Sequence, residues 1–453
     1  MLPVARSPVR VDTEERTTEM LSNGLRSRTP ARRGAAWGRS AVTCLTTVAA
    51  IAALTAGCGS SSSGGSSPGA TPSAGASGSS GGSSGSSGGG KSILIGTIAG
   101  TTGAYGSTGV AMVNGAKLAV SDINAAGGVN GRKFSLTTAN DNASATVASQ
   151  EYQKMVSDGA VAFTGSGDTG PATAAMSGRL QIPDIGVVDD AGITVYPKGP
   201  SEAPLPWAWS FGLNTFAWGA KDAEYALKNC KALAVLHDPT TYGGGGDDAI
   251  KLAYKNAGKT IALDDGITEN WSTGATVGLS SELNKIKSAG ADCVVVWLTP
   301  QDTAAFVQAM HSAGDNFTIL GNDEINADNT FSNLAGSQAN GAIGAVITSQ
   351  LTPSAALKDF TKRYQAQFHV AATPFAEATY DSVKMLAQVI KDNGGKTDPK
   401  SLQAGLNGVK NFAGLTGTLT LSAMKHATID EGQLTAVKYD ASKKQWVPLN
   451  GGT

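Results

Sequence analysis

From Lys91 onward, short apolar runs alternate with segments in which apolar residues recur at helical spacing. The first run, Ser92–Ile98, is predicted as a strand, and Val110–Ala125 as the helix after it, ended by the Gly127-Gly128 pair. Further strands are predicted at Phe134–Thr138, Ala160–Thr164, Ile182–Val188, Ala232–Leu236, Thr260–Leu263, Cys293–Leu298, Thr318–Leu320 and Gly344–Thr348. Strands that alternate with helices indicate parallel sheets, and there are too many here for one compact sheet. We therefore predict an α/β protein with two doubly wound parallel-sheet lobes.

The chain before Lys91 has a different composition. Residues 41–56 are uncharged and largely apolar, a length that suits a signal peptide and is too short to span a bilayer. Small residues then lead to Cys58, an arrangement that resembles a bacterial lipoprotein signal, although Thr55 stands at the usual Leu position. We expect residues 1–57 to be the signal, with a possible start at Met20, and Cys58 to carry lipid. A secretory signal with an incidental cysteine is the alternative.

Residues 58–90 form a Gly/Ser-rich tract after this cysteine. The tract has no apolar side chains that could offset the entropy cost of ordering its backbone. A flexible coil of about 32 residues would span roughly 30 Å. We predict a tether between a membrane surface and the folded domain, which places the protein outside the cytoplasm.

Charge and cysteine content narrow the function further. After residue 57 the chain has 27 basic and 32 acidic residues, so its formal charge is −5. This balance does not suggest nucleic acid or anionic lipid as a partner. Cys230 and Cys293 each precede an apolar run, so parallel pairing of these strands would bring both to one end of a sheet. A disulfide is expected in an exported protein, but sequence alone leaves it open.

Ligands bind beyond the carboxyl ends of strands in doubly wound sheets, where Gly-rich loops and acids gather in this chain. These loops are Gly100–Gly109, Gly165–Pro171, Asp189–Gly192, Asp238–Gly246, Trp297–Asp302 and Gly321–Glu324. The Gly165–Gly170 run matches GxGxxG, a dinucleotide fingerprint. However, it does not follow the first strand of its lobe, and an exported protein has no reliable nicotinamide supply. We favour a loop that presents backbone N–H groups to a small anion or carboxylate.

Other catalytic and cofactor motifs are missing from the sequence. It contains no GxSxG, Walker or HExxH motif, and its four histidines do not pair with cysteine at ligand spacing. We therefore expect no cofactor, no metal and no enzymatic activity. His237 follows a strand and could reach the cleft, although a structural histidine is the more economical interpretation.

The segment Gly115–Lys133 resembles the branched-chain amino-acid (Leu/Ile/Val) binding proteins, the type I periplasmic binding proteins of ABC importers. The segments Gly103–Gly106, Ala234–Gly243 and Tyr380–Leu386 support this resemblance, which extends from about Lys91 to Pro448. It implies two lobes joined by three crossings that close on ligand as a hinge. Lobe one would comprise residues 91–212 and 348–422, and lobe two would comprise 213–347 and 423–453.

The resemblance also implies which positions bind ligand. Tyr105 corresponds to a tyrosine near the cleft mouth, the Ser166-Gly167-Asp168 stretch to the carboxylate-binding loop, and Tyr242 to a cleft tyrosine of lobe two. Asp323 falls where the family places an acid that pairs with the ligand's ammonium group. An aromatic position falls on Trp297, or the neighbouring Thr299 takes its place.

One loop departs from the family pattern. Where the family commonly has Ser-Pro-Ala-Ala-Thr, this chain has Gly186-Val-Val188-Asp-Asp190, so a carboxylate replaces a carboxylate-binding hydroxyl. Repulsion between carboxylates would disfavour Leu, Ile or Val, and a cationic, amide or polyhydroxylated ligand would suit the acidic cleft better. Asp190 could instead point away and cap a helix.

These features predict a monomeric, lipid-anchored solute-binding protein that delivers a small polar ligand to a membrane permease. Two other functions stay open at this point. The same scaffold could serve as a sensor that reports ligand occupancy to a signalling protein. An extracytoplasmic hydrolase could use paired carboxylates in the acidic cleft.

Overall fold

The computed structural model describes residues 90–103, 106–167, 169–186, 194–199, 202–239, 241–269 and 279–449. The signal segment, Cys58 and almost all of the tether predicted from the sequence lie outside these ranges. Among the helices that the structure describes, none has the length and apolar character needed to cross a membrane.

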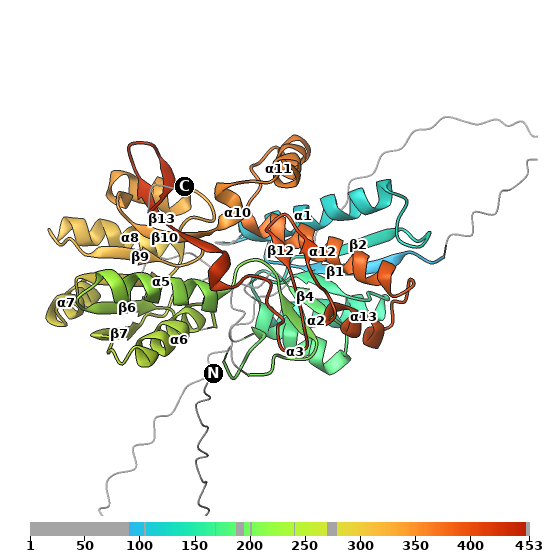
Figure 1. Ribbon diagram of the computed structural model, residues 1–453, viewed down its shortest axis with the longest axis horizontal. Coiled ribbons are helices and arrows are strands. Elements are labelled where there is room, and N and C mark those ends of the chain that lie inside the picture. Colours follow the sequence, from blue (N-terminus) through green and yellow to red (C-terminus); the bar gives the residue numbers. More distant parts are fainter. Residues whose placement is uncertain are drawn as a thin grey trace, which may run out of the picture. The chain divides into compact units, whose positions relative to one another are not determined.

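The first sheet contains five parallel strands in the order β2-β1-β3-β4-β5 (Figure 1). Its strands are β1 (Ile93–Ile98), β2 (Phe134–Ala139), β3 (Phe163–Gly165), β4 (Asp184–Gly186) and β5 (Ala208–Ser210). The intervening helices are α1 (Gly106–Ala125), α2 (Ala145–Ser157) and α3 (Gly170–Leu180). Helix α1 ends where the glycine pair predicted, because Gly127 and Gly128 have φ values of 101° and 82°.

The second sheet contains seven strands in the order β14-β13-β10-β9-β8-β6-β7. Its parallel strands are β6 (Leu233–His237), β7 (Leu263–Gly266), β8 (Cys293–Trp297), β9 (Thr318–Gly321) and β10 (Ile343–Ile347). The antiparallel strands β13 (Leu434–Asp440) and β14 (Gln445–Pro448) complete one edge. The helices of this part are α5 (Thr215–Asn229), α6 (Thr241–Asn256), α7 (Ser280–Ser288), α8 (Pro300–Ser312), α9 (Thr330–Ala335) and η1 (Gly336–Ala339).

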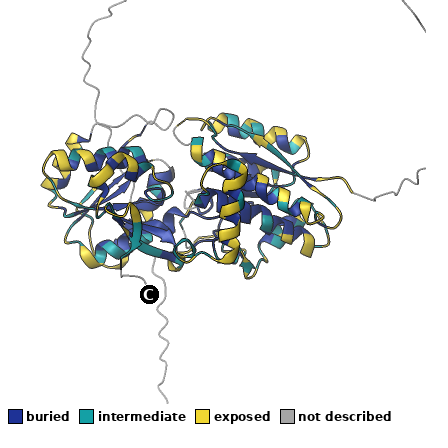
Figure 2. Ribbon diagram, turned by 90° about the horizontal axis from the view of Figure 1, so that it is seen from above, coloured by how far each residue is buried: buried dark blue, intermediate teal, exposed yellow. Residues whose placement is uncertain are grey.

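Strands β6, β8 and β10 are buried at every position, as expected for central strands covered by helices on both faces. Figure 2 shows buried strands in the interior and helices with exposed outer faces. The fold class predicted from the sequence is confirmed, with the antiparallel pair β13–β14 as an addition that the pattern did not predict.

After β10 the chain returns to the first sheet and packs against it. It forms α10 (Thr348–Leu351), α11 (Ala355–Phe368), α12 (Pro374–Asp392), α13 (Pro399–Leu406) and the small pair of β11 (Phe412–Ala413) and β12 (Thr418–Leu419). The short helix η2 (Glu431–Gln433) follows beside α5 and leads into β13. Helix α12 lies along α1 (Figure 1), where a Cβ atom on Gly115 would stand 2.3 Å from the Ala376 carbonyl oxygen. Glycine at position 115 therefore permits the close approach of the two helices.

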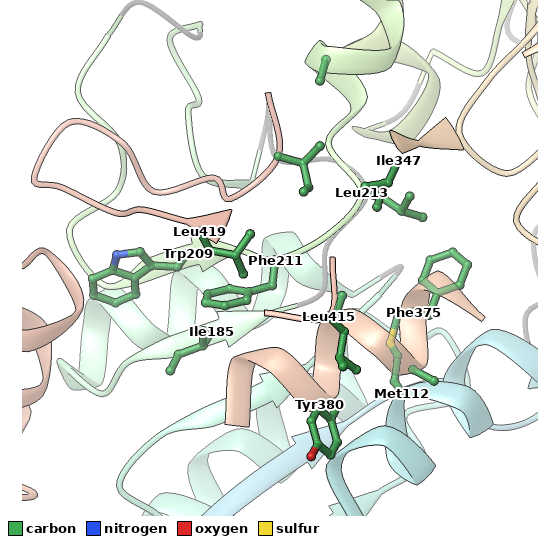
Figure 3. Packing of buried hydrophobic residues seen from close by; sticks show 14 of the residues in the cluster. Met112, Ile185, Trp209, Phe211, Leu213, Ile347, Phe375, Tyr380, Leu415 and Leu419 are labelled. Carbon is green, nitrogen blue, oxygen red and sulfur yellow. The ribbon is translucent and has the colours of Figure 1, made fainter. Parts of the chain in front are cut away.

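The chain passes between the two sheets at three places: after β5, after β10 and before η2. The first and third crossings are hydrogen-bonded to each other, because Ser210 N donates to His426 O at 2.8 Å and Thr428 N donates to Ser210 O at 3.0 Å. Figure 3 shows the apolar cluster at these crossings, where Phe211 and Leu213 lie with Ile347 and Leu415.

Candidate functional site

A pocket lies where the two sheets face each other, and the first turns of four helices line it. The first-sheet side contributes Ser107 and Thr108 at the start of α1 and Phe375 at the start of α12. The second-sheet side contributes Gln301 at the start of α8, together with the turn after β9. The residues of that turn that line the pocket are Glu324, Ala327 and Asp328, and Thr330 lines it from the start of α9.

Helix starts lie at this pocket because α1 and α8 directly follow strands β1 and β8 of parallel sheets. Pro300 occupies the first helical position of α8, and the Thr299 side chain caps that helix by accepting a hydrogen bond from Asp302 N. The first turn of a helix has backbone N–H groups without intrahelical partners and a positive end of the helix dipole. The pocket can therefore receive a negatively charged or hydrogen-bond-accepting group.

The Ser166 loop follows β3 on the first-sheet side. Ser166 is buried and has φ of 73°, a left-handed conformation that is uncommon for a residue other than glycine. Its N–H donates to the Ile98 carbonyl oxygen at 2.6 Å, which fixes the turn beside β1. Gly167 follows and is half-buried. Four other positions predicted to bind ligand lie outside the described residues: Tyr105, Asp168, Val188 and Asp190.

A short loop after β2 braces both first-sheet loops, and the sequence did not single it out. Asp141 is 1% exposed and accepts a hydrogen bond from Thr169 Oγ1 at 2.6 Å, which holds the Ser166 loop. Asn140 Oδ1 accepts from Thr101 N at 2.9 Å, which holds the loop after β1. Ala143 has φ of 54°, so the brace includes a strained backbone position.

The second-sheet positions predicted from the resemblance form one buried cluster. The Tyr242 hydroxyl, on the first turn of α6, donates to Asp323 Oδ1 at 2.9 Å. The Tyr242 and Trp297 rings lie 5.5 Å apart between centroids. Trp297 has no exposed surface, and its Nε1 donates to Asp222 Oδ2 at 3.2 Å. The Trp297 ring packs against Tyr242 and is enclosed by protein.

Two buried acids of the second-sheet part, Asp222 and Glu269, have raised pKa values. Burial raises the pKa of Asp222 well above the usual aspartate value, and the nearby charge of Asp323 adds to the rise. Burial also raises the pKa of Glu269, with further contributions from the hydrogen bond and charge of Asp302. The Glu269 carboxylate oxygen Oε1 accepts a hydrogen bond from Thr299 N at 2.8 Å, directly before α8. The α8 start that lines the pocket is therefore anchored to a buried acid pair.

The run of four glycines in α6 has a packing role. A Cβ atom on Gly246 would stand 2.2 Å from the Trp297 ring, and one on Gly245 would stand 2.6 Å from Thr215 Oγ1. Side chains at these positions would push α6 away from β8 and α5. The glycines thus bring the first turn of α6, with Tyr242, close to the cleft edge.

Cys230 and Cys293 form a disulfide with a Cα–Cα distance of 5.8 Å. Strands β6 and β8 are parallel neighbours, as the sequence argument required. The disulfide that the sequence alone left open is therefore formed.

Three of the loops that the sequence analysis expected to meet ligand contribute to the pocket, through Ser107, Thr108, Gln301 and Glu324, although none of these residues was singled out. Gln301 and Phe375 lie at helix starts whose relation to the pocket depends on how the two sheets face each other. Gln301 belongs to the predicted ligand loop Trp297–Asp302, whereas Phe375 lies outside the predicted loops and only Pro374, at the first helical position of α12, marked its helix start. Of the predicted positions, Tyr242, Trp297 and Asp323 come together, whereas Ser166 and Gly167 belong to the opposite sheet.

Comparison with known proteins supports the architecture. A model of the periplasmic binding protein family matches residues 92–444. A Leu/Ile/Val-binding protein homologue from Brucella melitensis is 27% identical over 361 residues, which cover 78% of this chain and 91% of that protein.

Two solved structures share the fold. A solute-binding protein of an ABC transporter from Rhodopseudomonas palustris, in complex with 3,4-dihydroxybenzoic acid, has a TM-score of 0.66 and 20% identity, with 79% of this chain and 95% of that chain covered. A branched-chain amino acid transporter substrate-binding protein from Streptococcus pneumoniae, in complex with isoleucine, has a TM-score of 0.65 and 22% identity, with 78% and 97% covered. The chain therefore belongs to the periplasmic binding protein family and has its type I fold, a family of solute-binding proteins and not of enzymes.

Proposed function

We propose that this protein is the solute-binding component of an ABC importer, anchored outside the cytoplasm through lipid on Cys58. As a monomer, it captures a small polar ligand between its lobes and delivers it to a membrane permease. The observation that supports this proposal most directly is the pocket lined from both sheets, with Thr108 on one side and Gln301 on the other. A ligand that contacts both sides stabilises the closed arrangement, which a partner can then recognise.

The connections between the sheets support a hinge. We assign residues 91–212 and 348–422 to lobe one, and residues 213–347 and 423–453 to lobe two. Thr348 Oγ1 lies 2.8 Å from the Gln433 carbonyl oxygen, to which it donates, so the second crossing is tied to the end of the third. Gly212, on the first crossing, has φ of 82° and lies where a Cβ atom would stand 2.5 Å from Ala378 Cβ. Closure would use these few backbone positions while the two sheets move as rigid bodies.

The pocket favours an amino-acid-like ligand. Helix starts and the hydroxyls of Ser107 and Thr108 supply hydrogen-bond donors on the lobe-one side. Glu324 and Asp328 supply carboxyl groups on the lobe-two side, which suit an ammonium, amide or polyol group. Isoleucine and 3,4-dihydroxybenzoic acid, found with the two related structures, both carry a carboxylate. We retain the hypothesis that Asp190 turns selectivity away from Leu, Ile and Val. Unchanged ligand preference in Asp190→Thr would refute that part alone.

A thermal-shift screen, followed by calorimetry, tests the proposed function. The panel contains polar, cationic and branched-chain amino acids, amides, polyamines, sugars and hydroxylated benzoic acids. Binding to the folded state alone raises the melting temperature, by an amount set by ligand concentration over Kd. We expect at least one polar amino-acid-like compound to bind with one-to-one stoichiometry and without turnover. Chemical conversion of the bound compound would contradict the proposal, as would failure of every member of the panel.

A further inference from the structure

A charged cluster lies on lobe two, outside the pocket and without a part in the proposed function. His237 ends β6, Asp264 lies on the neighbouring strand β7, and Asp247 and Lys251 occupy successive turns of α6. One ligand atom from each of His237, Asp247 and Asp264 lies within 4.8 Å of the other two. The Lys251 ammonium contacts both carboxylates, with Nζ 2.6 Å from Asp264 Oδ2.

Oxygen atoms face both nitrogens of the His237 ring. Its Nδ1 lies 3.2 Å from the carbonyl oxygen of Asp238, and its Nε2 lies 3.1 Å from Asp264 Oδ1 and 3.7 Å from Asp247 Oδ2. Carbonyl and carboxylate oxygens only accept hydrogen bonds, whereas a neutral imidazole has a single N–H. In the tautomer that carries its proton on Nδ1, the ring donates to the Asp238 carbonyl oxygen and directs the Nε2 lone pair toward the two carboxylates, where a metal cation can join all three groups.

We propose that His237, Asp247 and Asp264 form a binding site for a divalent transition metal such as zinc, whose place Lys251 fills in the metal-free protein. Zinc bonds of about 2.0–2.1 Å in a tetrahedral arrangement place neighbouring ligand atoms about 3.3 Å apart. The distances of 3.1 and 3.7 Å from His237 Nε2 bracket this value. The Nδ1 contact with a backbone carbonyl is the support that metal-bound histidines usually have.

Further observations support the site. Asp247 is 2% exposed, and its Oδ1 has no hydrogen-bond partner among the described residues, so it has capacity for another ligand. The Lys251 side chain is 43% exposed and has a flexible stem, so it can withdraw into solvent. Metal binding would join β6, β7 and α6 at one point.

Zinc titration of the full, chelator-treated chain tests the site without any knowledge of the transported ligand. We expect zinc alone to raise the melting temperature and to bind in calorimetry with one-to-one stoichiometry. His237→Gln and Asp264→Asn should abolish that binding. Lys251→Met should tighten it by about tenfold or more, because the competing like charge is gone. Two control variants are His311→Gln, at an exposed histidine of α8, and Lys255→Met, at an exposed lysine of α6. Both should bind zinc as the unaltered chain does.

Three results would overturn the proposal. The unaltered chain could show no zinc binding at millimolar concentration, whatever the Lys251 variant does. Zinc binding could persist in His237→Gln and Asp264→Asn, which would place the metal elsewhere. Lys251→Met could bind zinc no more tightly than the unaltered chain, which would exclude Lys251 as the resident cation. Melting curves with excess chelator show whether each variant is folded, and calorimetry then reports affinity independently of stability.

Discussion

At the scale of single residues, buried carboxyl groups determine how this protein responds to pH. Asp381 on α12 accepts hydrogen bonds from Leu415 N, Thr416 N and Thr416 Oγ1 at 2.9 to 3.1 Å, so it fastens the segment before β12 to the helix. Glu377 lies one turn earlier on the same helix and is 6% exposed. Two acids a turn apart in a buried site disfavour simultaneous ionisation.

The buried Glu377 carboxyl group is expected to make the free energy of unfolding depend on pH. Burial raises the pKa of Glu377 from 4.5 to about 7, and the charge of Asp381 adds to the rise, against a hydrogen bond from Gln350. Because the folded-state pKa is raised, the folded protein holds this proton more tightly than the unfolded chain. The contribution to stability is fully present below about pH 4.5 and is lost as pH rises through about 7, up to a total of about 3 kcal/mol.

Glu377→Gln keeps the shape of the side chain and removes its charge. We expect this variant to gain stability relative to the unaltered chain as pH rises from 5 to 8, roughly the window of the shift. Urea unfolding at a series of pH values measures the free-energy difference. Glu202→Gln, at an exposed position, should show no such trend. A constant difference between Glu377→Gln and the unaltered chain across this range would show that Glu377 is ionised in the folded state at all of these pH values.

At the scale of elements, close packing of helix against strand depends on a few glycines. Gly246 on α6 faces the fully buried Trp297 ring of β8, and Gly115 on α1 faces the backbone of α12. These positions lie within helices, where glycine lowers helix stability by roughly 1 kcal/mol relative to alanine. The closeness of the neighbours explains why glycine is nevertheless present.

Gly246→Ala tests this packing. Alanine would favour the helix by up to about 1 kcal/mol, but its Cβ atom would stand 2.2 Å from the Trp297 ring. Since the ring is enclosed, we expect a net loss of about 1–3 kcal/mol in the free energy of unfolding. Gly178→Ala on α3 is the matched control, because a Cβ atom there would meet nothing within 4 Å. Chemical denaturation should show that only the control is neutral or stabilising. Equal effects at both positions would contradict the packing argument.

Elements with strong apolar runs were predictable from the sequence, and elements at sheet edges were not. Strands β1, β2, β8 and β9 match their predicted positions within one residue at each end. The prediction Thr260–Leu263 ends where β7 begins, because this edge strand contains Asp264 and Asp265. Asp264 pairs with Lys251, and Asp265 pairs with Lys285. A prediction based on apolar runs excludes such charged residues.

The candidate site was predictable only in part, for a related reason. The carboxyl ends of β6, β8 and β9 meet at one edge, so topology alone brought Tyr242, Trp297 and Asp323 together. Asp222, which pairs with Trp297, lies on a helix, and helix periodicity does not indicate its partner. Gln301 lies in the predicted ligand loop Trp297–Asp302, but it was not singled out because its place in the pocket depends on how the two sheets face each other.

At the scale of the whole molecule, the proposed function links the three crossings to the shared pocket. The first and third crossings are hydrogen-bonded through Ser210 and Thr428, and Tyr196 Oη accepts a hydrogen bond from His426 N at 2.6 Å. Closure about such a hinge would lead to contacts on a ligand from both sheets at once. We therefore expect ligand affinity to depend on residues from both sides of the pocket.

Calorimetric Kd values for two single variants test that claim most directly. The ligand is the tightest-binding compound from the screen, and the variants are Thr108→Val on the first-sheet side and Gln301→Ala on the second-sheet side. Each removes a hydrogen-bonding group at the pocket, so we expect each to weaken binding by about tenfold, corresponding to about 1.4 kcal/mol. Unchanged affinity in either variant, with the fold intact by melting temperature, would contradict capture between the two lobes.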